Sequence, residues 1–385
     1  MIIKEVSAKV ILDSRKDKTI EISVKTNVGN FSASSPTGKS TGKYEAKPYK
    51  KSLDEDIAMI KNIKDYFSEE SIESFDDLKR IEYIADRNIG ANTKFALESA
   101  ALKALAKEKK VEVWQLINPR AKKFPRLVGN CIGGGKHSQT DGKKPDFQEF
   151  LLIPDEESAQ KSFEKNKKSK QSVETYLKIK NKSFKSRKND EDAWITSLND
   201  KEVLEILHET GVPLGIDVAS SSFFKRKKYY YDNPPLKRDA EEQEGYIANL
   251  IKNFNLLYIE DPFDEEDFES FAKLLKKFPN SLIVGDDLIV TNLKRLEKAI
   301  EKKSVNAIIV KPNQCGSLIE VKKVCELAKK NNIKLVFSHR SGETDENILA
   351  DLAFGFGADF LKCGITGTER ESKIKRLIEI EKNVR

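Results

Sequence analysis

The stretch LLYIEDPFDEEDFESFAKLLKKFPNSLIVGDDLIV, residues 256–290, contains two short apolar runs separated by a helical pattern. Each apolar run is followed by an acid, which is Glu260 after LLYI and Asp286 after SLIVG. Between them, DFESFAKLLKKF has the apolar spacing of an amphipathic helix. The stretch therefore predicts a strand, a crossover helix and a second strand of one parallel sheet.

The same pattern continues in both directions along the chain. Charged residues directly follow apolar runs at these positions: Asp217, Glu260, Asp286, Lys311, His339 with Arg340, and Lys362. From Glu260 onward the steps are roughly 25 residues, the length of one strand, one helix and two loops of a (β/α) barrel. Such a barrel brings its strand ends to one face, so these side chains should converge. A doubly wound open sheet shows the same alternation, but it usually concentrates its site at one switch point, which favours the barrel.

The length of 385 residues suits two domains. Residues 1–50 alternate apolar and polar positions, as antiparallel strands do, and residues 53–110 have helical patterns. We therefore predict an α/β protein with an N-terminal α+β domain over residues 1–125. The remaining residues, 126–385, have the typical size of a (β/α)8 TIM-like barrel.

The composition excludes several classes of protein. No apolar run approaches the roughly 20 residues of a membrane span, so no membrane partner is expected. The start, MIIKEVSAKVILDSR, has no apolar signal core, which indicates a cytoplasmic protein. The four cysteines lack the spacing of a metal site or a disulfide framework, so we expect reduced thiols.

One segment accounts for the net charge of +7. Residues 161–188 hold eleven Lys or Arg against two Glu, and the rest of the chain is close to neutral. Such a segment could attract a polyanion, but a solvated helix and loop is the simpler interpretation. No nucleic-acid-binding module accompanies it, so nucleic acid is not expected as a partner.

The three acids Asp217, Glu260 and Asp286 would repel one another on neighbouring strands unless a cation lay between them. Carboxylate oxygens without sulfur or imidazole suit Mg²⁺ rather than zinc. Lys311, at the end of AIIV, is a candidate base because burial and nearby cations would lower the pKa of its amine. A salt bridge to one of the carboxylates is an equally good interpretation of the spacing.

Two glycine-rich segments complete the set of motifs. PTGKST at 36–41 lacks the first glycine of a phosphate-binding loop, because position 33 is Ala, so it is interpreted as a loop that presents Ser40. GGGKH at 133–137 is a turn carrying His137, and it precedes an apolar strand that contains Gln148 and Glu149. Polar groups in such a strand are costly to bury without a partner, so they have either a task or a structural partner.

Taken together, these motifs resemble those of the enolase family, whose members interconvert 2-phosphoglycerate and phosphoenolpyruvate. The resemblance covers nearly the whole chain, from residue 11 to the end of the barrel, and rests on these stretches: ILDSR, STGKYEA, GAN, GGKH, FQEF, IEDPFDEED, VGDDLIVTN, KPNQCGS and SHRSGETDE. It implies an enolase-type barrel, a glycolytic lyase and a homo-oligomer acting on a small phosphorylated carboxylate. Enolase-superfamily sites are a known example of a Lys or His base working with bound Mg²⁺.

The resemblance also implies a role for each site residue. Two Mg²⁺ ions would be held, the first by Asp217, Glu260 and Asp286 and the second by Ser40. Lys311 would be the base and Glu191 the acid, supported by Glu149 and His137. Substrate-binding side chains would be Gln148, His339, Arg340, Ser341 and Lys362.

The chain departs from the family pattern near the expected acid. The loop reads NDEDA, so Asn189 and Asp192 stand where the family has glycine, and we expect a changed backbone path there. The charge of Asp192 is expected to raise the pKa of Glu191. Lys39 precedes Ser40 and would either pair with a phosphate or oppose the second metal. A paralogue with another carboxylate substrate, or with a non-catalytic binding or regulatory role, is the alternative to a working enolase.

Overall fold

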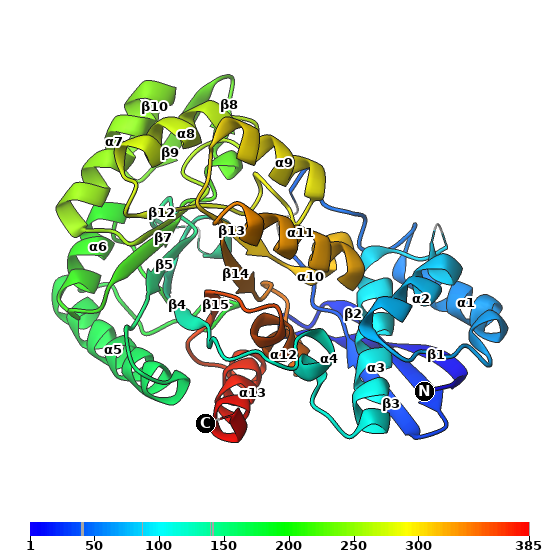
Figure 1. Cartoon of the computed structure of the whole chain (residues 1–385). Helices are drawn as coiled ribbons and strands as arrows, with labels where there is room; N and C mark the ends of the chain where they lie inside the picture. Colours follow the sequence, from blue (N-terminus) through cyan, green and yellow to red (C-terminus); the bar gives the residue numbers. More distant parts are fainter. Residues whose placement is uncertain (40–41, 87, 139, 141, 385) are drawn as a thin grey trace.

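The computed structural model describes residues 1–39, 42–86, 88–138, 140 and 142–384. Ser40 therefore lies outside the described residues. The N-terminal part is an antiparallel sheet covered by helices (Figure 1). Its strands are β1 (Ile3–Leu12), β2 (Lys18–Thr26) and β3 (Gly29–Ser34). Its helices are α1 (Leu53–Ile63), α2 (Leu78–Ala85), α3 (Ala91–Lys109) and α4 (Val113–Ile117), with 3₁₀ turns at Lys64–Phe67 and Phe75–Asp77.

The alanine-rich helix α3 packs on β2 and β3. Its small side chains allow this close approach, and most of its residues are buried. This arrangement confirms the predicted α+β domain.

The rest of the chain forms a closed barrel, which excludes the open sheet. Its strands, in spatial order, are β4 (Arg126–Gly133), β5 (Glu149–Leu152), β7 (Leu214–Asp217), β11 (Tyr258–Glu260), β12 (Leu282–Gly285), β13 (Ala307–Val310), β14 (Lys334–Ser338) and β15 (Phe360–Gly364). The pairing of β15 with β4 closes the barrel. The short strand β6 (Trp194–Ile195) pairs with β4 outside it.

The expectation of an all-parallel barrel is wrong at one strand. β5 runs antiparallel to both β4 and β7. Its first residue, Glu149, therefore lies opposite Asp217, the last residue of β7. The start of β5 consequently reaches the same face of the barrel as the carboxyl ends of the other strands.

Helices surround the barrel (Figure 1). They are α5 (Ala159–Lys180), α6 (Asp200–His208), α7 (Ala240–Phe254), α8 (Phe268–Lys277), α9 (Leu293–Lys302), α10 (Pro312–Cys315), α11 (Leu318–Lys330), α12 (Ile348–Gly355) and α13 (Thr368–Val384). A small separate sheet contains β8 (Phe224–Lys225), β9 (Lys228–Asp232) and β10 (Pro235–Arg238), and 3₁₀ turns lie at Gly135–His137 and Ser220–Ser222.

Two apolar clusters form the core. The larger one extends from the N-terminal sheet through the layer between strands and helices. The smaller one is built from side chains on barrel strands: Val128, Leu151, Ile153, Tyr258, Val284, Ala307, Ile309 and Val336. Within the described part of the chain, we find no helix with both the length and the apolar content needed to cross a membrane.

Candidate active site

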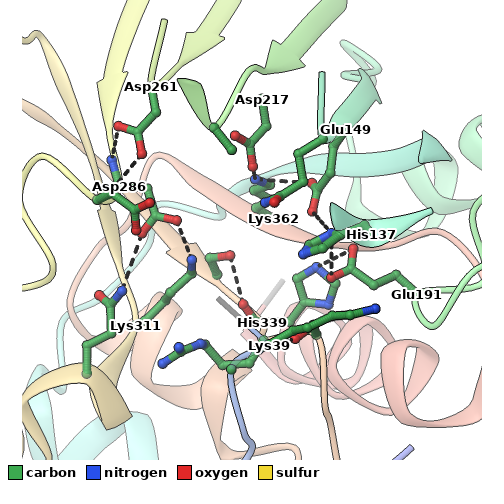
Figure 2. A pocket seen from close by; sticks show the side chains of 18 residues that line it. Lys39, His137, Glu149, Glu191, Asp217, Asp261, Asp286, Lys311, His339 and Lys362 are labelled. Atoms are coloured by element: carbon green, nitrogen blue, oxygen red, sulfur yellow. Dashed lines mark hydrogen bonds and ion pairs between the residues drawn. The ribbon is translucent and has the colours of Figure 1, made fainter. Parts of the chain in front are cut away.

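Strand register places three buried carboxylates in a row. Glu149 is opposite Asp217, and Asp217 is opposite Glu260 on the next strand. Lys362, on β15, reaches all three. Its Nζ lies 3.1 Å from Glu149 Oε2 and 2.9 Å from Asp217 Oδ2 (Figure 2). It also lies 2.8 Å from Glu260 Oε2. The converging strand ends predicted from the sequence are therefore brought together here.

Burial and neighbouring charges together determine which groups of this row are ionised. Burial and the neighbouring charge of Asp217 raise the pKa of Glu260 well above its usual value. Burial by itself would lower the pKa of Lys362, but Asp217, Glu149 and Glu260 outweigh it and raise that pKa well above its usual value. Lys362 is therefore held as an ammonium ion that compensates the carboxylates.

Lys311 forms a close ion pair with Asp286. The expectation that burial and nearby cations lower the pKa of Lys311 is wrong. Both do act in that direction, but the charge of Asp286 outweighs them and the pKa is raised. The salt bridge left open by the sequence is thus present. Lys311 lines the same pocket as the carboxylates, so the pair does not remove it from the site.

Asp261 and Asp287 are acids of the site that sequence reasoning missed. The two Asp261 oxygens accept the backbone N–H groups of Asp286, at 2.9 Å, and Asp287, at 2.7 Å. Carboxylate oxygens of Asp261, Asp286 and Asp287 lie within 4.8 Å of one another and could hold a metal ion. The sequence contained a signal for them, because the ends of β11 and β12 are each marked by two consecutive acids, Glu260 with Asp261 and Asp286 with Asp287.

The opposite wall contains Glu191, His137 and Glu149. His137 Nδ1 lies 3.2 Å from Glu149 Oε1 and 3.5 Å from Glu191 Oε1. Glu191 Oε2 accepts a hydrogen bond from Asn130 Nδ2 at 2.8 Å. Burial would raise the pKa of Glu191, but the positive charges of His137 and Arg370 outweigh it and lower the pKa to about 2.

The expectation that Asp192 raises the pKa of Glu191 is wrong. The Asp192 carboxylate is paired with Lys170, at 3.1 Å, and Lys188, at 2.9 Å, and contacts the Thr366 hydroxyl. Its charge is therefore compensated on the side of α5. Asp192 has φ 60°, the left-handed conformation that glycine favours, so it occupies a glycine-like backbone position.

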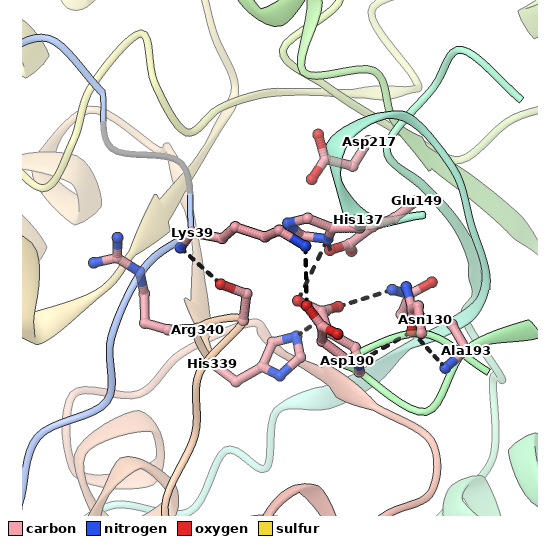
Figure 3. Close-up of polar contacts among 12 residues, drawn as sticks. Lys39, Asn130, His137, Glu149, Asp190, Ala193, Asp217, His339 and Arg340 are labelled. Atoms are coloured by element: carbon pink, nitrogen blue, oxygen red, sulfur yellow. Dashed lines mark hydrogen bonds and ion pairs between the residues drawn. The ribbon is translucent and has the colours of Figure 1, made fainter. Parts of the chain in front are cut away.

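The residues expected to bind an anion, Arg340 and Ser341, follow the end of β14. Arg340 donates to Glu45, with Nη1–Oε1 2.7 Å and Nη2–Oε2 3.2 Å. Ser341 Oγ accepts the backbone N–H of Lys39 at 2.8 Å. Lys39 Nζ reaches across the pocket to Asp190 Oδ2 at 3.0 Å, so its observed partner is a carboxylate (Figure 3).

One pocket collects most of the predicted site residues. Its lining includes these: His137, Gln148, Glu149, Glu191, Asp217, Asp286, Lys311, His339, Arg340, Ser341 and Lys362. Glu260 is fully buried next to Lys362 and does not line the pocket. Glu45 is another residue that the sequence did not single out.

A closed barrel with carboxylates, two buried lysines and an arginine at one mouth defines a TIM-barrel enzyme. The enolase N-terminal domain model matches residues 3–117, and the enolase C-terminal TIM barrel domain model matches residues 121–385. The chain belongs to the enolase family.

Three relatives that match over nearly their full length are named Enolase. The one from Methanocorpusculum labreanum is 37% identical, with 99% of each chain covered. The one from Methanosphaera stadtmanae is 36% identical, covering 100% of this chain and 97% of the relative. The one from Pyrobaculum aerophilum is 35% identical, covering 94% and 90%.

Proposed function

We propose that this protein is an enolase, a lyase that reversibly dehydrates 2-phosphoglycerate to phosphoenolpyruvate. The observation that carries the proposal is the placement of Lys311 and Glu191 on opposite walls of one pocket, with Lys362 between them (Figure 2). A substrate lying against Lys362 would present one face to a base and the other to an acid. A non-catalytic role is not favoured, because the full-length relatives are named Enolase.

Lys311 acts as the base that removes the proton from carbon 2. This step requires a neutral amine, so the ion pair with Asp286 must be weaker when substrate is bound than it is here. Lys362 supplies a fixed positive charge for the carboxylate that gains charge as the proton leaves. Its burial among acids keeps it protonated throughout.

The acid side works as a coupled unit. Glu191, with a pKa of about 2, is ionised at neutral pH. Burial opposes protonation of His137, but Glu191 and Glu149 outweigh it and raise the His137 pKa. The proton given to the departing 3-hydroxyl therefore belongs to the His137–Glu149–Glu191 unit rather than to one isolated carboxyl group.

The polar side chains of the pocket fit the rest of the substrate. Arg340, Ser341 and His339 would bind the phosphate. Gln148 would contact the substrate directly, and its buried Oε1 has no hydrogen-bond partner among the described residues. An oxygen without a partner in the protein can accept a hydrogen bond from a hydroxyl group of a ligand.

The carboxylates at this mouth fit Mg²⁺. They offer only oxygen atoms, and the two lysines leave their charge incompletely balanced. We assign Asp217, Glu260 and Asp286 to one Mg²⁺ and Ser40 to a second. Mg²⁺ would supply Lewis-acid stabilisation of the charge that develops on the substrate carboxylate.

We further propose that the protein is a homo-oligomer, as inferred for its family. We also propose that residues 1–125 form a capping domain and that residues 126–385 form the catalytic domain.

The test follows phosphoenolpyruvate formation from 2-phosphoglycerate by absorbance, with Mg²⁺ and then with EDTA. We expect metal-dependent turnover that falls by about 10³-fold in Lys311→Ala, since general acid–base catalysis contributes on that order. Lys277→Ala, which removes a partly exposed lysine paired with Glu244, is the matched control and should retain turnover. A folded wild-type protein without turnover would refute the proposal.

A further inference from the structure

Arg370 is a fully buried arginine in the first turn of α13, with 1% of its surface exposed. None of the ion pairs found between described residues involves it. Its donors instead meet neutral acceptors: Arg340 O at 2.6 Å, Ser341 O at 2.7 Å, Asp190 O at 3.1 Å, His339 Nδ1 at 3.1 Å and Ser14 Oγ at 3.4 Å. Burying a charge whose direct contacts are all neutral is costly, so this set of contacts indicates a specific task.

The contacts of Arg370 join two parts of the pocket that are remote in sequence. Asp190 precedes Glu191 in the loop that carries the acid. Arg340 and Ser341 belong to the segment after β14 that would bind phosphate. One rigid, planar guanidinium therefore fixes the distance between the acid and the anion-binding residues.

The backbone is shaped to admit this side chain. A Cβ at Gly364 would lie 3.0 Å from Arg370 Cγ and 2.8 Å from Glu191 O. Gly367 has φ +102°, a conformation that side chains disfavour. The turn between β15 and α13 thus uses glycine where the arginine and the acid loop need room.

Arg370 also determines the tautomer of His339. A guanidinium has only donors, so His339 Nδ1 must be the acceptor in their contact. The proton of the neutral ring is then on Nε2, which lies 3.6 Å from Glu191 Oε2. The ring therefore presents an N–H group to the carboxylate of the acid.

We propose that Arg370 is a positioning residue of the reaction, holding His339 as the Nε2–H tautomer directed at Glu191 and clamping the acid loop to the phosphate-binding segment. The catalytic part of this inference rests on the proposed function. The tautomer itself can be measured without any turnover. The charged groups that act on His339 are Arg370, Lys362 and Lys311 on the positive side and Glu149 and Glu191 on the negative side.

The first experiment is ¹⁵N NMR of the histidine rings in the full chain. The chain has three histidines, so the signals can be assigned with His208→Asn and His339→Gln. We expect His339 to show a protonated Nε2 and an unprotonated Nδ1 across neutral pH. A protonated Nδ1 would overturn the proposal, whether or not the protein turns over 2-phosphoglycerate.

The second experiment compares Arg370→Met, Arg370→Lys and the control Arg376→Met. Arg376 lies on the same helix and is paired with Asp351 at 2.8 Å, away from the pocket. We expect kcat to fall about 100-fold in Arg370→Met, the effect of misplacing catalytic groups by about 1 Å. The His339 ring should also lose its fixed tautomer, and the pH profile of kcat should shift.

Arg376→Met separates a positioning role from the general effect of losing a partly buried arginine of the same helix. It should reduce stability but keep the kcat and pH profile of the wild type. Arg370→Lys keeps the charge and should restore part of kcat, and it replaces the methionine variant if that variant does not fold. Unchanged kcat and an unchanged His339 tautomer in a folded Arg370 variant would overturn the proposal, whereas an inactive wild type with the expected tautomer would refute only the enolase activity.

Discussion

The Asp200 carboxyl group is buried at the start of α6 and accepts the backbone N–H of Phe147 at 3.0 Å. Burial raises its pKa to about 8. Because the pKa is higher in the folded than in the unfolded chain, the contribution of Asp200 to stability is complete below its usual pKa. That contribution is lost as the pH rises toward 8.

Asp200→Asn should therefore stabilise the protein at alkaline pH. The amide keeps the acceptor and cannot ionise, so the gain in the free energy of unfolding should grow from pH 5 to pH 8. It should reach about 1 kcal/mol or more, since one pKa unit corresponds to about 1.4 kcal/mol. Urea unfolding at several pH values measures it.

Asp155→Asn removes an exposed carboxylate and is the control for this experiment. It should leave the pH dependence of unfolding unchanged. A constant difference between Asp200→Asn and wild type across the pH range would contradict the buried ionisation.

Site residues at the ends of barrel strands could be predicted one by one from the sequence. Residues such as Glu45 and Arg370, which contact the site from elsewhere in the chain, could not. Asp217, Lys311 and Lys362 each follow an apolar run, which marks them in the sequence. Glu45 and Arg370 lie in polar stretches of ordinary composition. Their roles depend on contacts across the fold, which no local pattern encodes.

At the scale of elements, the acid loop is held by the helix and turn beside it. The side chain of Asn189 accepts the N–H groups of Glu191, at 3.0 Å, and Ala193, at 2.9 Å. Lys170 of α5 is buried and pairs with Asp192. Side-chain contacts therefore fix the loop at the two positions, Asn189 and Asp192, where the family pattern has glycine.

Asp192→Gly should destabilise the protein, even though glycine suits the backbone at this position. It leaves the buried Lys170 without its carboxylate, which we expect to cost about 2 kcal/mol after allowance for the partial exposure of Asp192. The double variant Lys170→Met with Asp192→Gly removes both charges. It should be more stable than the sum of the single changes by at least about 1 kcal/mol, measured by urea unfolding.

Additive effects in this cycle would show that the pair is not coupled. Lys178→Met with Glu174→Gln, a more exposed pair on the same helix, provides the comparison. Its coupling should be only a few tenths of a kcal/mol, as is usual for exposed pairs.

Element type was predictable along the barrel, but the direction of one element was not. The alternation of apolar runs and amphipathic helices predicts strands and helices without their orientation. Between β4 and β5 the described residues form a 3₁₀ turn but no crossover helix, which permits the antiparallel pairing. Only the family resemblance indicated that Gln148 and Glu149 belong to the pocket.

At the scale of the molecule, Gly316 marks a contact between the N-terminal helices and the barrel. It ends α10, which begins directly after Lys311, and a Cβ there would lie 2.5 Å from Ala91 Cα. Gly316 has φ +75°. Backbone of the barrel thus packs directly on the first turn of α3.

Gly316→Ala should destabilise the protein by more than backbone strain at a positive φ would alone. Gly211 has φ +65°, and a Cβ there would meet no described atom within 4 Å, so Gly211→Ala measures strain alone at about 1–2 kcal/mol. Gly316→Ala should cost about 1–3 kcal/mol more because of overpacking. Thermal unfolding of both variants tests this, and equal losses would show that the contact adapts.

The hydrogen bond between Arg370 and Ser14 joins residues 356 positions apart in the chain. A ribosome adding about 5–20 residues per second needs tens of seconds to make that length. During this interval the N-terminal sheet can already be folded, while the pocket still lacks the arginine that clamps it. Each new copy of the protein therefore cannot complete its pocket before residue 370 has been made and released from the ribosome, when contacts among the preceding residues have already become possible.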